Sequence, residues 1–559
     1  MSPKSPMSRR SFLAGSTAAG GLAVLGAAGG LSGCSSGADS SSTSTHNPSG
    51  SSKPGVNTAT ARKGGAITIG TLAEVNGLNP ATARWDTNGI LYANTVYDPL
   101  MWVADDGTVQ PYLAASMTPN GDYTEWTLTL RPGVTFSDGS DLTATVVKNN
   151  FTALASSALT GQATKGITAE VSGPLTLTYT LDEPRPHFPF TLTNQGGYVI
   201  GQAMLDQAAA GLTPVPIGTG PFVYSSWVPN SHFIATRNPN YWQHGLPHLD
   251  QVTFTPILDS SQRANSLQSG SIDLMVTTDP TSINDLSRKA GYQVVDSLSG
   301  VVGEPTITSI VLNTTTAPTD DLRIRRALAM GLDVAAVLNV IGGGLTKPID
   351  GLFLPGSPYY SDTGYPAYDQ AAGRALVNEY KAQHGTPSLT LSTITDPLFE
   401  SLVQVVQQMW NQIGFDVQLS VLDPAELISD LVSGHFQASI DLQYGAVDPD
   451  LNYTWFSTTT TGGGGNFALN FSRNSDPEIE AALQSGRTTA NEATRVAAYR
   501  KLNQRLAVDI PNLWLEQAPY AAIGSERVQN FAGLTLPNGS VGYGFDEGVF
   551  FPSQIWLSS

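Results

Sequence analysis

The residues of this chain that best suit chemistry are aromatic, amide and acidic side chains in expected loops, outside regular elements. They are Trp85, Gln195, Gln443, Tyr444, Asp448 and Trp455. Such side chains stack on a small solute and hydrogen-bond to it while excluding water. Ordinary core packing is the alternative for any one aromatic taken alone. The sequence therefore predicts a binding cleft, to which the segment 443–456 contributes most.

Motifs for catalysis or for metal binding have no support in the sequence. No His-Glu-x-x-His, Cys-x-x-Cys or P-loop string occurs, and the 7 histidines are scattered singly. One Gly-x-Ser-x-Gly string, Gly33 to Gly37, lies in a Ser- and Gly-rich stretch, where no strand and helix could hold a nucleophile elbow. We therefore expect no enzyme activity, no cofactor and no metal site.

Length and charge limit the class of protein. A chain of 559 residues is too long for one simple core, so two or three domains are expected. The net charge of −18, with only 28 Lys and Arg, argues against nucleic-acid binding. It weakly favours neutral or cationic ligands, although acidity that merely aids solubility is the preferred explanation.

The N-terminus has the features of an export signal. Arg9 and Arg10 precede a Gly- and Ala-rich apolar run, as in a Tat signal, and this run is too weakly hydrophobic to favour a membrane span. Leu31-Ser32-Gly33-Cys34 then matches a bacterial lipobox, and Cys34 is the single cysteine. We predict that residues 1–33 are a signal peptide and that a lipid on Cys34 anchors the protein to the outer face of the cytoplasmic membrane.

Residues 34–63 are mostly Ser, Thr, Gly, Ala and Pro, which bury too little surface to fold, so a flexible tether is expected there. The body that follows mixes two kinds of periodicity. In 121–139, Trp126, Leu128 and Leu130 alternate with polar residues as in a half-buried strand, and Val134 and Phe136 continue the alternation after a turn.

Helices are expected between such strands. Thr143 is a plausible N-cap for a helix that ends near Leu154, and Asp476-Pro477 opens another helix, which Gly486 is expected to end. Residues 389–421 read as strand, helix and strand, the pattern of a parallel crossover with buried sheet faces. The sequence thus predicts an α/β protein.

Several strings occur in an order that resembles a known family. They are Gly121 to Gly139, Gly218 to Phe222, Arg237 to Trp242 and Leu267 to Asp273. In these strings the chain resembles the family 5 bacterial extracellular solute-binding proteins, which serve peptide and nickel ABC importers. The resemblance covers residues 64 to about 535.

This resemblance implies a periplasmic-binding-protein-like fold of type II, with two lobes joined by a hinge and an extra inserted domain. The implied domain I comprises 64–105, 215–312 and 520–559. The inserted domain II is 106–214 and domain III is 313–519. A ligand would be enclosed between the lobes.

The resemblance also implies a function. The protein would be a monomeric substrate-binding lipoprotein that delivers a small solute to the permease and ATPase of an ABC importer. In oligopeptide binders an acidic residue stands three or four positions before the Asp-Pro pair, where this chain has Tyr444 and Gly445. Peptide or peptide-like ligands remain slightly ahead of sugars and other organic solutes. The alternatives are a signalling or adhesion lipoprotein and, least supported, a secreted hydrolase.

Overall fold

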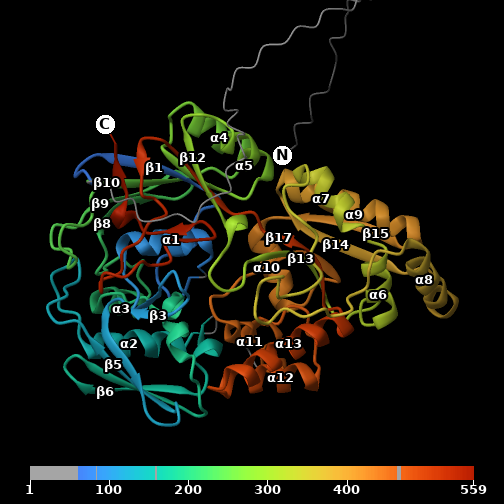
Figure 1. Ribbon diagram of the computed structural model, residues 1–559, viewed down its shortest axis with the longest axis horizontal. Helices are drawn as coiled ribbons and strands as arrows, with labels where there is room; N and C mark the ends of the chain where they lie inside the picture. The colour runs from blue at the N-terminus through green and yellow to red at the C-terminus, as the bar shows by residue number, and fades with distance from the viewer. Residues whose placement is uncertain (1–60, 84, 158–159, 463–467, 559) are drawn as a thin grey trace, which may run out of the picture. The chain divides into compact units, whose positions relative to one another are not determined.

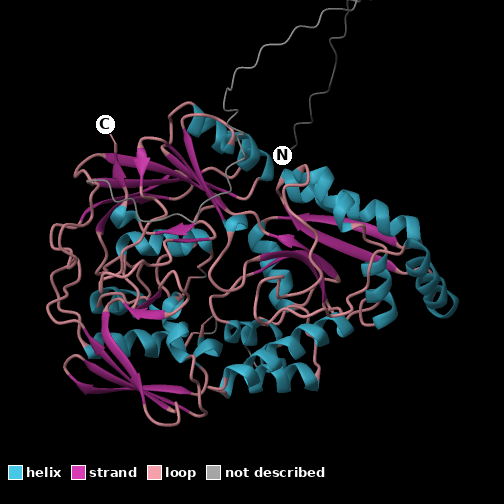
Figure 2. Ribbon diagram, viewed as in Figure 1, coloured by secondary structure: helices cyan, strands magenta, loops and turns pink. Residues whose placement is uncertain are grey.

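The structure is a computed structural model that describes residues 61–83, 85–157, 160–462 and 468–558. The predicted signal peptide, Cys34 and most of the predicted tether lie outside these residues. Within the described part of the chain, two large sheets and one small sheet alternate with helices (Figures 1 and 2). None of the helices described there is both long and apolar enough to cross a membrane.

The first lobe is built on a seven-stranded sheet in the order β12-β18-β11-β1-β10-β9-β8. Its strands are β1 (Ala66–Thr71), β8 (Phe222–Val228), β9 (His232–Arg237), β10 (Gln251–Pro256), β11 (Leu274–Thr277), β12 (Tyr292–Asp296) and β18 (Ala521–Ser525). Its helices are α1 (Thr87–Val96), α4 (Ser260–Gln268) and α5 (Pro280–Ser287). The central strand β1 runs parallel to both β10 and β11. Helix α1 packs on one face, while α4 and α5 pack in a separate apolar cluster.

A four-stranded antiparallel sheet, in the order β4-β5-β7-β6, forms the inserted part of the chain. Its elements are β4 (Ala114–Pro119), β5 (Glu125–Leu130), β6 (Ile167–Gly173) and β7 (Thr176–Leu181), with α2 (Ala144–Ala155) and, after the sheet, α3 (Gln202–Ala209). The expected strand at Trp126–Leu130 and the Thr143 N-cap are both confirmed. The expected alternation at Val134 and Phe136 is confirmed in their burial, but the segment forms no regular strand, only a loop with a Thr135–Asp141 bridge.

The second lobe is built on a five-stranded sheet in the order β15-β14-β16-β13-β17. Its strands are β13 (Ile307–Leu312), β14 (Ser388–Ile394), β15 (Asp416–Leu422), β16 (Ala438–Gln443) and β17 (Asn512–Gln517). The predicted parallel pairing around 389–421 is confirmed, since β14 runs parallel to β15. Alternate residues of β13 face two different cores: Ile310 and Leu312 pack with α9 (Pro397–Ile413), whereas Val311 packs with α10 (Pro424–Ser433). The sheet is therefore covered on both faces.

The remaining helices of this lobe are α6 (Leu322–Met330), α7 (Val334–Gly342), α8 (Gln370–His384), α11 (Tyr453–Phe456), α12 (Pro477–Thr488) and α13 (Glu492–Asp509). The expectation that Gly486 ends α12 is wrong, because the helix continues to Thr488. Gly486 instead lies where a Cβ would come within 2.6 Å of Tyr499 Cζ, so glycine lets α13 pack closely on α12. Short strand pairs complete the fold: β2 (Met101–Val103) with β3 (Val109–Pro111), β19 (Val528–Gln529) with β22 (Trp556–Leu557), and β20 (Phe545–Asp546) with β21 (Val549–Phe550).

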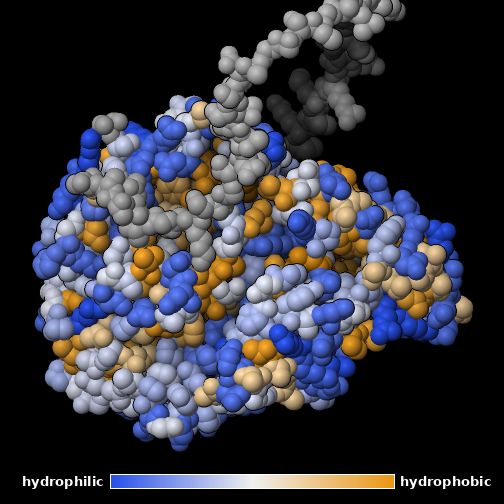
Figure 3. Space-filling view, in the orientation of Figure 1, coloured by the Kyte–Doolittle hydropathy of each residue, from blue (hydrophilic) through white to orange (hydrophobic). Residues whose placement is uncertain are grey.

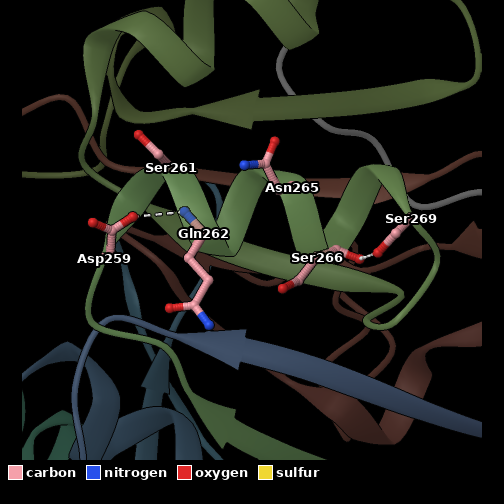
Figure 4. A pocket seen from close by; sticks show the side chains of 6 residues that line it. All are labelled: Asp259, Ser261, Gln262, Asn265, Ser266 and Ser269. Carbon is pink, nitrogen blue, oxygen red and sulfur yellow. Dashed lines mark hydrogen bonds between the residues drawn. The ribbon is translucent and has the colours of Figure 1, made fainter. Parts of the chain in front are cut away.

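The surface of the described residues is mixed. In the space-filling view, orange apolar residues are interspersed with blue polar ones on the visible face (Figure 3). Leu258 and Val340 are the most exposed large apolar side chains, at 64% and 66%. An open hollow of about 580 Å³ runs along α4, lined by residues between Asp259 and Ser269 (Figure 4). None of the predicted ligand-binding residues lines this hollow.

The core of the second lobe gives a stability prediction. Trp410 is fully buried in α9, and its indole nitrogen donates to the carbonyl of Leu328 at 3.0 Å. Trp410→Ala removes a large apolar volume, so we expect it to lower the free energy of unfolding by about 3–5 kcal/mol in chemical denaturation. Val421→Ala, at a position 46% exposed, serves as the control and should change stability by less than about 0.5 kcal/mol. Equal effects of the two variants would contradict this packing.

Buried acids give a pH prediction. Burial raises the pKa of Glu516 in β17 to about 7, although a hydrogen bond from Thr346 opposes the shift. The pKa of Glu516 is higher in the folded protein than in the unfolded chain, where it is about 4.3. The contribution of Glu516 to stability is therefore fully present below about pH 4.3 and is lost as the pH rises through about 7. We therefore expect the wild-type melting temperature to fall between pH 5 and pH 8. Glu516→Gln should reduce the change in unfolding free energy over this pH range by up to about 3 kcal/mol. The same change of stability with pH in the variant and the wild type would contradict the raised pKa of Glu516.

Candidate functional site

Two chain crossings connect the large sheets, and they form the framework of the site. Residues 297–306 join β12 to β13, and residues 518–520 join β17 to β18. Ser297 ties the crossings together: its hydroxyl donates to the Ala518 carbonyl at 3.1 Å and accepts from the Tyr520 amide at 3.1 Å. Its own amide donates to the Tyr520 carbonyl at 2.8 Å. The two crossings therefore lie side by side as one connection between the lobes.

A hairpin near the C-terminus reaches this connection. Glu547 and Gly548 form the two-residue turn between β20 and β21, with φ of 49° and 93°, the positive values that a type I′ turn requires. The Glu547 carboxylate accepts from the Thr306 amide at 2.6 Å and bonds the Thr306 hydroxyl. That hydroxyl also accepts from the Gly445 amide at 2.9 Å. One side chain thus links the first lobe, a crossing segment and the loop that follows β16.

The loop and the crossing segment approach very closely. Glu304 and Ala446 exchange both backbone hydrogen bonds, at 2.8 and 2.9 Å. A Cβ at Gly445 would lie 2.3 Å from the Glu304 carbonyl, and one at Gly303 would lie 2.4 Å from the Ala446 carbonyl. No side chain fits at residue 445 in this arrangement. The acidic residue of oligopeptide binders therefore has no possible counterpart at that position.

Tyr444 and Trp455, both predicted to contact a ligand, lie close together. Their ring centroids are 6.0 Å apart, and Trp455 also contacts Phe471 at 6.1 Å. Burial raises the pKa of Tyr520, in the second crossing, well above its usual value. The aromatic pair of the second lobe therefore lies next to the first crossing, which Gly445 and Ala446 contact.

Asp448 is committed to partners within the protein. It is paired with Arg495 at 2.6 Å and with His187 Nδ1 at 3.3 Å, and its side chain is only 3% exposed. Burial raises the pKa of Asp448, but the hydrogen bond from His187 and the charge of Arg495 outweigh this effect, so its pKa lies below the usual value. The sequence missed Arg495 and His187, because their pairing depends on chain segments far apart.

His187 belongs to a group of polar contacts between the inserted part and the second lobe. Gln484 in α12 donates to Glu183, which precedes His187 by four residues. Arg487 Nε donates to Asp450 Oδ1 at 2.8 Å, and the charges of Arg487 and Asp450 both act on Arg185. Residues 183–187 of the inserted part therefore contact the second lobe through charged and amide side chains.

Trp85 of the first lobe and Gln195 of the inserted part also touch each other. The Gln195 amide oxygen accepts from the Trp85 backbone at 3.2 Å, and its nitrogen donates to the carbonyls of Pro80 and Ala83 at 2.6 and 2.7 Å. Trp85 is 8% exposed and stacks on Tyr97 with centroids 6.2 Å apart. These contacts hold the loop before α1, and ligand binding by the pair stays a prediction.

Two buried polar groups beside the loop after β16 have unused hydrogen-bonding capacity. Gln443 is 6% exposed, and its side-chain nitrogen has no partner. Glu304 is 7% exposed, and its Oε2 has no partner, while its Oε1 accepts from Ser357 at 2.7 Å. Sequence reasoning identified Gln443 but missed Glu304, which lies between strands without any local pattern. Within the described ranges no cluster of three or more His, Cys, Asp or Glu could hold a metal ion.

The Asp448–Arg495 pair gives a third prediction. Asp448→Asn leaves a buried guanidinium without its counter-charge, so we expect it to destabilise the fold by about 3–5 kcal/mol in denaturant titration. Asp416→Asn serves as the control, because Asp416 lies on the surface of β15, and it should have little effect. A fully stable Asp448→Asn protein would show that the pair is not structural.

Comparison with known proteins agrees with this architecture. The probable D,D-dipeptide-binding periplasmic protein of Escherichia coli K12 is 27% identical over 83% of this chain and 91% of its own length. The nickel-binding periplasmic protein of the same organism is 27% identical over 82% and 93%. Among solved structures, one neighbour is the periplasmic binding protein AgaA of A. tumefaciens R10 in complex with agropinic acid. It superposes with a TM-score of 0.78 at 22% identity, and the match covers 89% of this chain and 99% of AgaA.

The solved structures show that the fold is that of the type II periplasmic binding proteins. The family model for the bacterial extracellular solute-binding proteins, family 5 (middle), matches residues 108–465, more than half of the chain. The chain belongs to the family 5 bacterial extracellular solute-binding proteins.

Proposed function

We propose that this protein is the substrate-binding component of an ABC importer, which captures a small solute between its lobes and delivers it to a membrane permease. The observation that carries the proposal is the position of the Tyr444–Trp455 surface beside the first crossing, which the next residues of the same loop contact. A surface placed at a hinge can contact a solute from one lobe while the other lobe closes over it. No catalytic group is required for this role.

We further propose the domain division that the family resemblance implies, with one adjustment. The first lobe comprises 64–105, about 215–296 and 520–559, and the inserted domain is 106–214. Because β13 lies in the five-stranded sheet, the second lobe begins at Ile307 and extends to about 519. Residues 297–306 are then the first hinge segment.

The proposed ligand is a peptide or a peptide-like solute. The relatives in E. coli are named for a D,D-dipeptide and for nickel, and the described residues of this chain offer no metal cluster. The proposed place of action is the outer face of the cytoplasmic membrane, where a lipid on Cys34 would hold a monomer close to the permease and ATPase. The lipobox at Leu31–Cys34 supports the anchor.

Native mass spectrometry of the purified protein tests this function. We expect a small solute to co-purify and to be released on denaturation, and the extracted solute to rebind and to close the lobes in solution scattering. A receptor function would be contradicted if repeated preparations contain no bound solute and if screens of dipeptides, sugars and nickel complexes show neither binding nor closure.

The aromatic surface gives a fourth prediction. Tyr444→Ala should weaken binding of the extracted solute by at least about fivefold in calorimetry, since about 1 kcal/mol of stacking is lost, and the melting temperature should change little. Trp455→Ala should weaken binding in the same way. Tyr368→Ala, at a tyrosine 50% exposed, is the matched control. Wild-type affinity in both site variants would remove this loop from the site.

A further inference from the structure

Glu304 carries a buried carboxylate oxygen that the protein leaves without a partner. The residue is 7% exposed, and of its two oxygens only Oε1 is bonded, to the hydroxyl of Ser357. No ion pair among the described residues includes Glu304. Buried polar groups are nearly always satisfied, so an exception in a native fold needs an explanation. One explanation is that the missing partner belongs to a ligand.

The position of Glu304 supports this explanation. It lies in the crossing segment between β12 and β13, two residues before Thr306, which Glu547 holds. Its backbone pairs in both directions with Ala446, two residues after Tyr444. The unpartnered oxygen therefore lies at the connection between the lobes, beside the loop that carries the proposed aromatic surface.

The neighbours of Glu304 do not supply a cation. Arg495 in α13 binds the hydroxyl of Tyr359, two residues after Ser357, and its guanidinium is already paired with Asp448. Burial raises the pKa of Glu304 to about 7, as expected for a carboxyl group without a counter-charge. A ligand cation would supply that charge and would form a strong, charge-assisted hydrogen bond.

We propose that Glu304 Oε2 accepts a hydrogen bond from a protonated amino group of the bound solute. The solute class is therefore small molecules with a primary ammonium group, of which peptides with a free N-terminus are members. Glu304 would supply an acidic group from the crossing segment, at the residue whose backbone pairs with Ala446. This inference rests on the proposed receptor function and specifies its ligand chemistry.

The test uses Glu304→Gln, which keeps the shape of the side chain and removes its charge. A pool of dipeptides and the same pool after N-acetylation are offered to the full-length protein, and retained species are identified by native mass spectrometry. We expect the wild type to retain members of the free-amine pool and to bind them at least about tenfold more tightly than their acetylated forms. Glu304→Gln should lose this preference while its melting temperature stays equal or rises.

Glu516→Gln is the matched control, because Glu516 is an equally buried acid, in β17 of the second lobe, whose carboxylate is bonded to Thr346. It should retain the preference for free amines.

A wild type that retains no free-amine member, or a Glu304→Gln protein that keeps the full preference, would overturn the inference. If acetylated dipeptides, sugars or nickel complexes are retained instead, the ammonium inference fails but the receptor function stands. If no solute of any class is retained, both fail.

Discussion

The carboxylate of Glu547 holds the point at which the two lobes meet. It bonds both the amide and the hydroxyl of Thr306, and that hydroxyl receives the amide of Gly445. Burial, together with the neighbouring charge of Asp546, raises the pKa of Glu547, because both disfavour its ionised form. One chain of hydrogen bonds therefore fixes three segments relative to one another: the hairpin turn at Glu547-Gly548, the hinge segment and the loop that begins at Tyr444.

This constraint decides which groups remain for a ligand. The close approach that the chain enforces leaves no space for a side chain at Gly445, and Asp448 is already paired with Arg495. Among the described residues, Glu304 is the acid with a buried, unpartnered oxygen, and it lies in the crossing segment that pairs with this loop, which is why we assign it the proposed acidic contact. In the proposed receptor, the residues that pack the hinge and the residue that would bind the ligand are therefore neighbours.

Local patterns predicted much of the fold but only part of the site. Alternation gave the strand at Trp126–Leu130, and side-chain capping gave the start of the helix after Thr143. Both depend on residues close in sequence. Glu304 and Glu547 were not predictable in this way, because their roles depend on partners far along the chain. The prediction that Gly486 ends α12 failed because packing against Tyr499, rather than local propensity, places that glycine.

The most direct measurement is hydrogen–deuterium exchange of the protein with and without the solute that co-purifies with it. Binding at the hinge should slow exchange at the amides of Glu304 and Thr306 and in the segment Tyr444–Trp455, since these groups become covered when the lobes close. A site between the lobes would be contradicted if exchange slows only in other regions, such as α4 beside its open hollow, and does not change in the hinge segment or the loop.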